Sequence, residues 1–321
     1  MPELERKSAG ERSNRVRTAT ASNRRRQSLG VVSNIAFLRT SEWLVATYFV
    51  LAASRAAMRG AYAVAALDAS VPLVFLSIEI IERRARWAWI AIARDWIPLA
   101  LLLPAYWNID VVATPRSSYA FEFQWIGMDR LLLNKWHVRA IIESLGPLLP
   151  SVVECCYLIL YAVPVLLLGA VYQFSGRQRA DEFLFTLLAG TLFAYSLLPL
   201  FPSESPRILF PEQDLPTITT VFRRVNIWLL NACDIRTSVF PSGHVTVAFS
   251  CAFAAISAIP TKPWIGRLLL LFATLVAINT LYGRYHFAID ALAGFGIAVL
   301  GYLISRRVHR SLEQPGITPE H

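Results

Sequence analysis

Long apolar runs recur through most of this chain and constrain its fold more than any other feature. A run of about 20 residues can cross the hydrocarbon core of a bilayer as a helix. The backbone finds no water to bond there, so open sheet edges are not tolerated and the spans must be helical. Eight candidate spans cover residues 43–62, 66–82, 87–108, 147–173, 183–201, 244–260, 266–283 and 286–305.

The composition supports the same conclusion. Hydrophobic residues make up 55% of the chain and charged residues 17%, against roughly 25% charged in an ordinary soluble domain. This composition excludes a disordered chain and argues against a soluble enzyme. We predict an all-α fold, a polytopic transmembrane helical bundle of about eight spans. The span at 66–82 is the weakest of them because it carries Asp68 and Glu79.

The positions of Lys and Arg predict the orientation. If the chain crosses the membrane at each span, the two termini and three short loops lie on the same side. These segments hold nineteen of the 31 basic residues, so the positive-inside rule makes this the cytoplasmic side. Residues 1–42 read as a disordered basic cytoplasmic tail, because an apolar segment comes too late for a cleaved signal peptide. Residues 43–306 form the membrane domain and 307–321 a second cytoplasmic tail. The Arg-rich run at 24–26 is interpreted as a topology determinant, not a nucleic-acid site.

Two longer loops, 109–146 and 202–243, then lie outside. The first contains alternating apolar and basic residues over 128–146, which is typical of a helix lying in the membrane interface. The second contains four arginines on the side where positive charge is disfavoured. An anionic substrate would explain them, and so would pairing with nearby acidic residues. The arginines are Arg207, Arg223, Arg224 and Arg236, and the acidic residues are Glu204, Glu212, Asp214 and Asp234.

Three short clusters lie at the outer ends of the last four spans. They are Phe201–Arg207, Phe240–His244 and Tyr282–Asp290. The second is a turn that leads into a helix, whose first N–H groups and dipole favour an anion. Gly243 allows close backbone approach, and Ser242 adds a hydroxyl donor.

The side chains of these clusters suit phosphoryl transfer. Arg207 and Arg284 can bind phosphate oxygens in forked pairs. His286 and Asp290 are four residues apart, so on a helix they share one face. A carboxylate that holds one imidazole nitrogen leaves the other free to attack, and His244 is available to protonate a leaving oxygen.

Each residue also has a structural interpretation, since a lone His at a helix start or a lone membrane Asp can simply be a satisfied polar group. A zinc site needs three or four ligands, and the remaining histidines do not supply them at suitable spacing, so we predict no metal and no cofactor. The cysteines show no CxxC spacing and read as small apolar residues. The histidines are His137, His309 and His321, and the cysteines are Cys155, Cys156, Cys233 and Cys251.

The second and third clusters resemble those of the type 2 phosphatidic acid phosphatase superfamily, whose patterns are Pro-Ser-Gly-His and Arg…His-x-x-x-Asp. The resemblance spans about residues 183–305. It implies a metal-independent helical membrane enzyme with a six-helix core and its site at the outer face. It implies His286 as nucleophile, Asp290 as its partner, and His244 as general acid. It also implies three phosphate ligands, Ser242, Gly243 and Arg207.

The chain departs from the usual superfamily patterns at several positions. The first pattern, Lys-x6-Arg-Pro, has Leu200 and Ile208 where Lys and Pro are usual; Arg236 is our candidate stand-in for the missing cation. The third-cluster Arg usually lies six residues before the His, where Thr280 stands, and here Arg284 lies two before it. That arrangement is similar to the inositol phosphorylceramide synthase-like branch, as is the run Arg94-Asp95-Trp96-Ile97-Pro98.

These features predict a lipid phosphotransferase that moves a phospho-head group from a lipid donor to an alcohol acceptor through a phosphohistidine. One alternative is a lipid phosphate or pyrophosphate phosphatase that uses water. An alternative of another class is a transporter or a non-catalytic scaffold, although no inverted repeat supports it. We expect a bacterial inner (plasma) membrane protein with membrane lipids as substrates and no nucleic-acid partner; the oligomeric state stays open.

Overall fold

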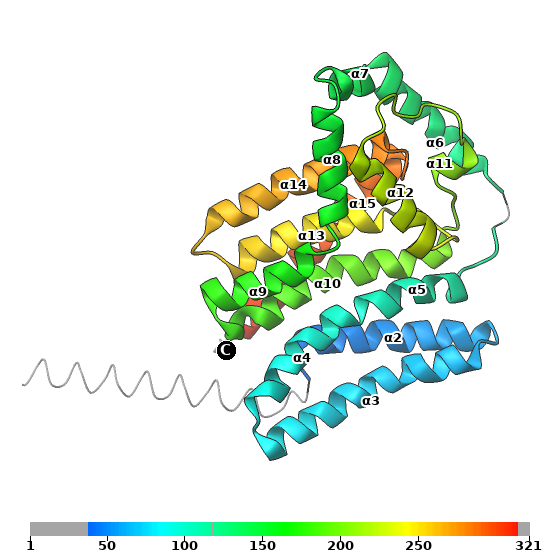
Figure 1. The fold of residues 1–321 in the computed structure, drawn as a ribbon. Helices are drawn as coiled ribbons and strands as arrows, with labels where there is room; N and C mark the ends of the chain where they lie inside the picture. Colours follow the sequence, from blue (N-terminus) through cyan, green and yellow to red (C-terminus); the bar gives the residue numbers. More distant parts are fainter. Residues whose placement is uncertain (1–37, 117, 314–321) are drawn as a thin grey trace, which may run out of the picture. The chain divides into compact units, whose positions relative to one another are not determined.

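The computed structural model describes residues 38–116 and 118–313 (Figure 1). The chain divides into two units, Met1–Arg39 and Thr40–His321, and the helices belong to the second. The predicted basic tail lies almost wholly outside the described residues, as do the last eight residues of the predicted C-terminal tail. The last helix continues to Glu313.

All regular structure in the described ranges is helical, which confirms the predicted all-α bundle. The longer helices are α2 (Thr40–Met58), α3 (Tyr62–Ala85), α4 (Ala88–Ala100), α5 (Leu102–Val112), α8 (Leu148–Ile159), α9 (Val163–Ser175), α10 (Ala180–Leu197), α12 (Val221–Cys233), α13 (Gly243–Ala258), α14 (Pro263–Tyr282) and α15 (Ala288–Glu313). Shorter segments are α6 (Ala120–Arg130), α7 (Val138–Glu143), α11 (Pro206–Leu209) and the turns η1 (Leu131–Lys135), η2 (Arg177–Arg179) and η3 (Leu198–Leu200).

In the described ranges, five helical segments are long and apolar enough to cross a membrane, and a bent pair makes a possible sixth, where about eight spans were predicted. The five are Tyr62–Ala85, Ala88–Val112, Arg177–Leu200, Pro263–Tyr282 and Ala288–Leu312. The predicted span at 147–173 is broken into α8 and α9, which meet at 70°. Pro164, at the start of α9, explains the break, because proline has no N–H and disfavours a helical residue before it.

Helix α10 lies at the centre of the bundle, with thirteen of its residues buried. It packs against α13, α15 and α2 (Figure 1). The α10–α15 contact depends on Gly190 and Gly301, because a Cβ at Gly301 would lie 2.6 Å from the Gly190 nitrogen. Small residues let membrane helices approach closely enough for van der Waals contact to hold them together.

Buried charges tie the N-terminal helices together. Arg94 on α4 donates to both carboxylate oxygens of Glu42 on α2, at 2.7 and 2.5 Å, and pairs with Glu79 and Glu82 on α3. Asp181 caps α2 by accepting hydrogen bonds from the backbone and hydroxyl groups of Thr40 and Ser41. The Arg94 side chain thus joins three helices.

The two longer loops, 109–146 and 202–243, carry short helices, and the single interface helix predicted over 128–146 is broken. Helix α6 runs into η1, and α7 follows after a turn at His137, which has φ +56°. A β-carbon disfavours this left-handed conformation within a helix, so the predicted helix ends there. Helix α12 forms in the second loop and packs against α8.

Candidate active site

The three clusters singled out in the sequence meet at one place in the structure. The Arg207 N–H donates to the Arg284 carbonyl at 3.1 Å, and the Ser242 N–H donates to the Asp290 carbonyl at 3.0 Å. Gly294 on α15 makes the second contact possible, because a Cβ there would lie 2.6 Å from the Ser242 carbonyl oxygen. The loop ends of α13 and α15 are therefore held together by main-chain bonds.

His286 and His244 face each other across this junction. The Nε2 of His286 lies 3.5 Å from the Nδ1 of His244. The two histidines that the sequence analysis paired are therefore neighbours in the structure. A phosphoryl group transferred in line cannot fit between two nitrogens at this spacing, so substrate binding must separate the rings.

The hydrogen bond at Nδ1 sets the tautomer of the His286 ring. Its Nδ1 lies 2.9 Å from the Val239 carbonyl oxygen and 3.5 Å from Asp290 Oδ2. A carbonyl oxygen only accepts, so Nδ1 carries the proton and Nε2 keeps the lone pair. The Phe287 N–H holds Asp290 Oδ2 at 2.9 Å. Sequence reasoning found Asp290 but missed Val239, because a main-chain carbonyl leaves no trace in residue type.

His244 lies in the first turn of α13. Ser242 caps that helix, with its hydroxyl accepting from the Val245 N–H at 3.3 Å. The Nε2 of His244 lies 3.0 Å from the Tyr161 hydroxyl, and its ring stacks on Tyr157 with centroids 4.6 Å apart. Neither tyrosine was predicted as a site residue, since both lie within an apolar run at 147–173 and are separated from His244 by more than eighty positions.

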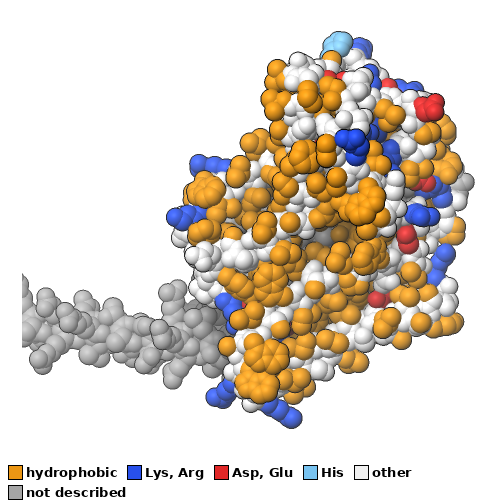
Figure 2. Space-filling view, viewed as in Figure 1, with side chains coloured by type: hydrophobic (Ala, Val, Ile, Leu, Met, Phe, Trp, Pro, Cys, Tyr) orange, Lys and Arg blue, Asp and Glu red, His pale blue; other side chains and the backbone are white. Residues whose placement is uncertain are grey.

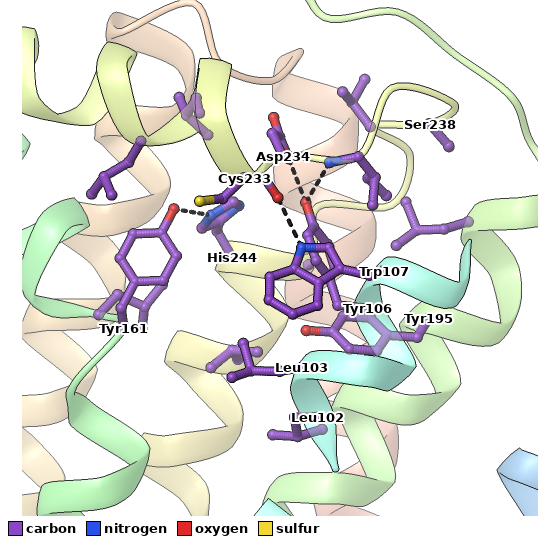
Figure 3. Close-up of a pocket in the computed structure, with 18 of the residues that line it drawn as sticks. Leu102, Leu103, Tyr106, Trp107, Tyr161, Tyr195, Cys233, Asp234, Ser238 and His244 are labelled. Carbon is purple, nitrogen blue, oxygen red and sulfur yellow. Dashed lines mark hydrogen bonds between the residues drawn. The ribbon is translucent and has the colours of Figure 1, made fainter. Parts of the chain in front are cut away.

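An apolar cavity of about 330 Å³ opens beside the two imidazoles (Figure 3). Both His244 and His286 line it, together with Gly243. The rest of the wall is mainly aliphatic and aromatic and comes from α5, the α8–α9 connection, α9, α10, η3, α12 and α13. Its members include Leu102, Leu103, Tyr106, Trp107, Leu160, Tyr161, Pro164, Tyr195, Leu198, Leu229, Leu230 and Val247.

Arg207 is held near the polar end of this cavity. Its Nη1 donates to Asn231 Oδ1 at 2.8 Å, and its Nη2 lies 3.6 Å from Asp234 Oδ2. Asp234 lines the cavity and accepts a hydrogen bond from the Tyr106 hydroxyl of α5 (Figure 3). Burial raises the pKa of Asp234 above its ordinary value. The sequence suggested Asp234 only as one of four partners for external arginines.

Two other predicted phosphate ligands, Arg236 and Arg284, are not among the residues that line the cavity. The Arg236 side chain is exposed, and its main-chain N–H bonds the Asp110 carboxylate. Arg284 is fully buried and pairs with Asp129 of α6 at 2.7 Å. Phosphate binding by either residue stays a prediction, as it does for Ser242, Gly243 and Arg207.

Asp129 also holds the start of α15, because its other oxygen accepts from the Ala288 N–H at 2.9 Å. Burial raises the pKa of the Asp129 carboxyl to about 6, although the Ala288 N–H and the Arg284 guanidinium oppose the change. The sequence offered no signal for Asp129, which is one of several acidic residues in the segment 109–146.

The raised pKa of Asp129 predicts a pH-dependent stability. The native state keeps this proton up to about pH 6, whereas the unfolded chain releases it near 3.8. The unfolding free energy therefore increases as pH falls through this window, and that gain is absent above it. Asp129→Asn has no group to titrate here. We expect the wild-type free energy of unfolding, minus that of Asp129→Asn, to increase by up to about 3 kcal/mol between pH 7 and pH 4. Unfolding of both proteins in detergent across this range measures the difference, and a flat or falling difference would contradict the prediction.

The described ranges contain no group of three or more His, Cys, Asp or Glu side chains arranged to hold a metal ion. The site instead contains the imidazole of His286, with its proton on Nδ1, the imidazole of His244, and nearby guanidinium groups.

The fold and the site together define a class: a multi-pass helical membrane protein with two facing histidines beside an apolar cavity. The sequence model of the PAP2 superfamily matches residues 126–304. This match covers more than half of the chain, so the chain belongs to the PAP2 superfamily, and the predicted superfamily is confirmed. Helices α2–α5 lie outside the matched residues.

A PA-phosphatase related-family protein of Dictyostelium discoideum is similar to this chain, with 24% identity over 131 residues. The match covers 38% of this chain and 22% of that protein, so the chain matches only about a fifth of its relative's length. No solved structure matches the chain. The comparisons do not identify a branch of the superfamily, so similarity to the inositol phosphorylceramide synthase-like branch stays a resemblance. Arg94 and Asp95, two of the residues on which this resemblance rests, bind other helical segments in the structure. Arg94 joins the glutamates described above, and Asp95 bonds Tyr172 and Arg177.

Proposed function

We propose that this protein is a membrane lipid phosphotransferase that moves a phospho-head group from a lipid donor to an alcohol acceptor through a phosphohistidine on His286. The observation that carries this proposal is the geometry of His286, whose Nδ1 bonds the Val239 carbonyl and whose Nε2 lies 3.5 Å from His244 at the wall of an apolar cavity. Membership of the PAP2 superfamily supports a phosphatase- or phosphotransferase-type lipid enzyme.

In the proposed reaction, Nε2 of His286 attacks the phosphorus of the donor. The N–P bond forms as the bond from phosphorus to the leaving oxygen breaks, and protonated His244 gives that oxygen its proton. An acceptor hydroxyl then attacks the same phosphorus and loses its proton to His244, and the N–P bond breaks. Arg207, Ser242 and Gly243 bind the phosphoryl oxygens. The nucleophile and the acid are regenerated, so the cycle needs no cofactor.

The walls of the cavity support a lipid donor. Leu103, Trp107 and Tyr161 line it while remaining 59%, 52% and 51% exposed. Hydrophobic side chains also cover much of the protein face in Figure 2. In a bilayer such side chains contact hydrocarbon, and a lipid tail would leave this environment for the cavity with little change in its surroundings.

A lipid phosphatase that uses water is the second candidate, favoured by the relative described as a PA-phosphatase related-family protein. The two functions share the phosphohistidine and differ in whether an alcohol enters while water is kept out. Purified protein should be incubated with labelled lipid phosphate donors, with and without inositol or other alcohols. A labelled alcohol phosphate supports the transferase, and free phosphate alone supports the phosphatase. No turnover of any donor and no labelled protein would contradict both and favour a transporter or scaffold.

The outer-face location is part of the proposal and predicts a labelling pattern. Ser118 and Gln213 are exposed residues of the two longer loops, which the basic-residue distribution assigns to the outside. A single cysteine at either position, with the native cysteines replaced by alanine, should react with a membrane-impermeant maleimide in intact cells. A cysteine at Arg179, on the opposite side in this topology, is the control and should react only after permeabilisation. The reverse pattern would show that the orientation is inverted.

A further inference from the structure

Glu154, on α8, is a heavily bonded carboxylate that the proposed reaction does not use. It is fully buried and accepts hydrogen bonds from four side chains. The donors are Arg223 at 3.1 Å, Asn226 at 2.7 Å, Asn279 at 3.3 Å and Tyr285 at 2.8 Å. An ionisable group placed this deep in a membrane protein is costly, so a specific role is expected of it.

These donors connect α8 to α12, to α14 and to the loop before α15. Arg223 extends the connection, because its Nη1 also donates to the Gly283 carbonyl at 3.1 Å. Its guanidinium carbon lies 5.7 Å from the centre of the Tyr285 ring. The loop that presents His286 is therefore fastened at Gly283 and at Tyr285, on both sides of Arg284.

The same network reaches the second histidine through aromatic rings. Tyr285 packs on Tyr157 with centroids 4.8 Å apart, and Tyr157 stacks on His244 at 4.6 Å. Tyr157 lies three residues after Glu154 on α8, so one turn of this helix contacts both structures that carry a histidine. None of Glu154, Tyr157 and Tyr285 is among the residues that line the cavity.

We propose that Glu154 and Tyr285 are positioning residues that set the distance between His286 and His244. Tyr285 is adjacent to His286 in the chain and reaches His244 through the Tyr157 ring. The Glu154–Tyr285 hydrogen bond therefore anchors the loop that carries His286 to α8, the helix whose Tyr157 ring supports His244. This inference rests on the proposed phosphohistidine mechanism.

Tyr285→Phe tests the inference because it removes only the hydroxyl that bonds Glu154 and keeps the ring on Tyr157. Misplacing a reacting group by about 1 Å can cost about 100-fold in rate. We expect kcat to fall by about 10- to 100-fold while KM stays close to the wild-type value, because substrate contacts are unchanged. Tyr172→Phe is the matched control. It removes a tyrosine–carboxylate bond of the same kind, from Tyr172 on α9 to Asp95 at 2.5 Å, and should keep the wild-type kcat.

Tyr157→Leu provides a second measurement that does not depend on the folding of Tyr285→Phe. It removes the ring that supports His244, so its kcat should fall more for a donor with a poor leaving group than for one with a good leaving group. A global structural defect would lower both equally. Thermal unfolding of each variant in detergent shows whether the fold is kept.

His286→Ala in the same assays distinguishes a failure of the positioning role from a failure of the phosphohistidine mechanism. If His286→Ala turns over donors at the wild-type rate, the proposed mechanism is wrong. If His286→Ala is inactive while Tyr285→Phe matches Tyr172→Phe, and Tyr157→Leu lowers the turnover of both donors equally, the mechanism survives and the positioning role is overturned. A selective loss of kcat in Tyr285→Phe, or a leaving-group-dependent loss in Tyr157→Leu, supports the role.

Discussion

Replacing His286 with alanine is expected to abolish turnover and the covalent phosphoenzyme together. In the structure the Nδ1 proton of His286 is directed at the Val239 carbonyl, 2.9 Å away, and Nε2 is the nitrogen that remains to attack phosphorus. No donor should rescue this variant, because the attacking atom itself is gone. Acid-labile phosphate on the protein, measured after a short incubation with labelled donor, reports this step directly.

Replacing His244 with alanine should have a different effect. General-acid assistance is typically worth about 10²–10⁴-fold, so turnover of a donor with a poor leaving group should fall by that amount. A donor whose leaving group departs without a proton should largely restore the rate, and the phosphoenzyme should still form from it. His309→Ala is a suitable control, since His309 lies on α15 and bonds the Ser305 carbonyl, and it should behave as wild type.

The opposite outcome would reverse the two roles. Rescue of His286→Ala by a better leaving group, or loss of the phosphoenzyme only in His244→Ala, would make His244 the nucleophile. The structure argues against that exchange. His244 Nε2 contacts the Tyr161 hydroxyl, at 3.0 Å, and the Asp290 carboxylate lies 3.5 Å from Nδ1 of His286.

Arg207→Lys is expected to lower kcat/KM by about 100-fold. One arm of the guanidinium bonds Asn231 at 2.8 Å and the other is directed at Asp234, 3.6 Å away, so the planar group is held in one orientation. A lysine ammonium is a point charge without this fork. Losing one charge-assisted hydrogen bond costs about 1.5–3 kcal/mol, and about 2.7 kcal/mol corresponds to the expected 100-fold.

The measurement is steady-state turnover of one lipid donor by Arg207→Lys and by Arg224→Lys. Arg224 lies on α12 and is exposed, so its exchange for lysine should leave kcat/KM unchanged. The missing superfamily lysine, replaced by Leu200, leaves fewer cations to compensate for the loss of Arg207. Near-normal turnover of Arg207→Lys would remove Arg207 from the phosphate-binding residues.

Much of this protein could be predicted from local patterns. Apolar runs of spanning length require helices wherever they occur, because lipid leaves the backbone no other partner. The turn before His244 and the closeness of His286 to Asp290 are equally local, since a helix start is readable within a few residues. His286 itself lies just before α15, so the pair does not share a helix face as predicted. These features were enough to predict the helical bundle and to identify the superfamily.

Other features depended on the tertiary structure because they join residues far apart in the chain. The Val239 carbonyl that orients His286 is separated from it by 47 positions, and the Tyr285–Glu154 bond spans 131. Arg284 has a guanidinium suited to phosphate, yet packing buries it against Asp129, 155 positions away. Residue type sets what a side chain can bind, whereas its partner is set by which helices pack together. The sequence therefore determined the chemical groups of this protein, and only the packed helices decided which of them meet.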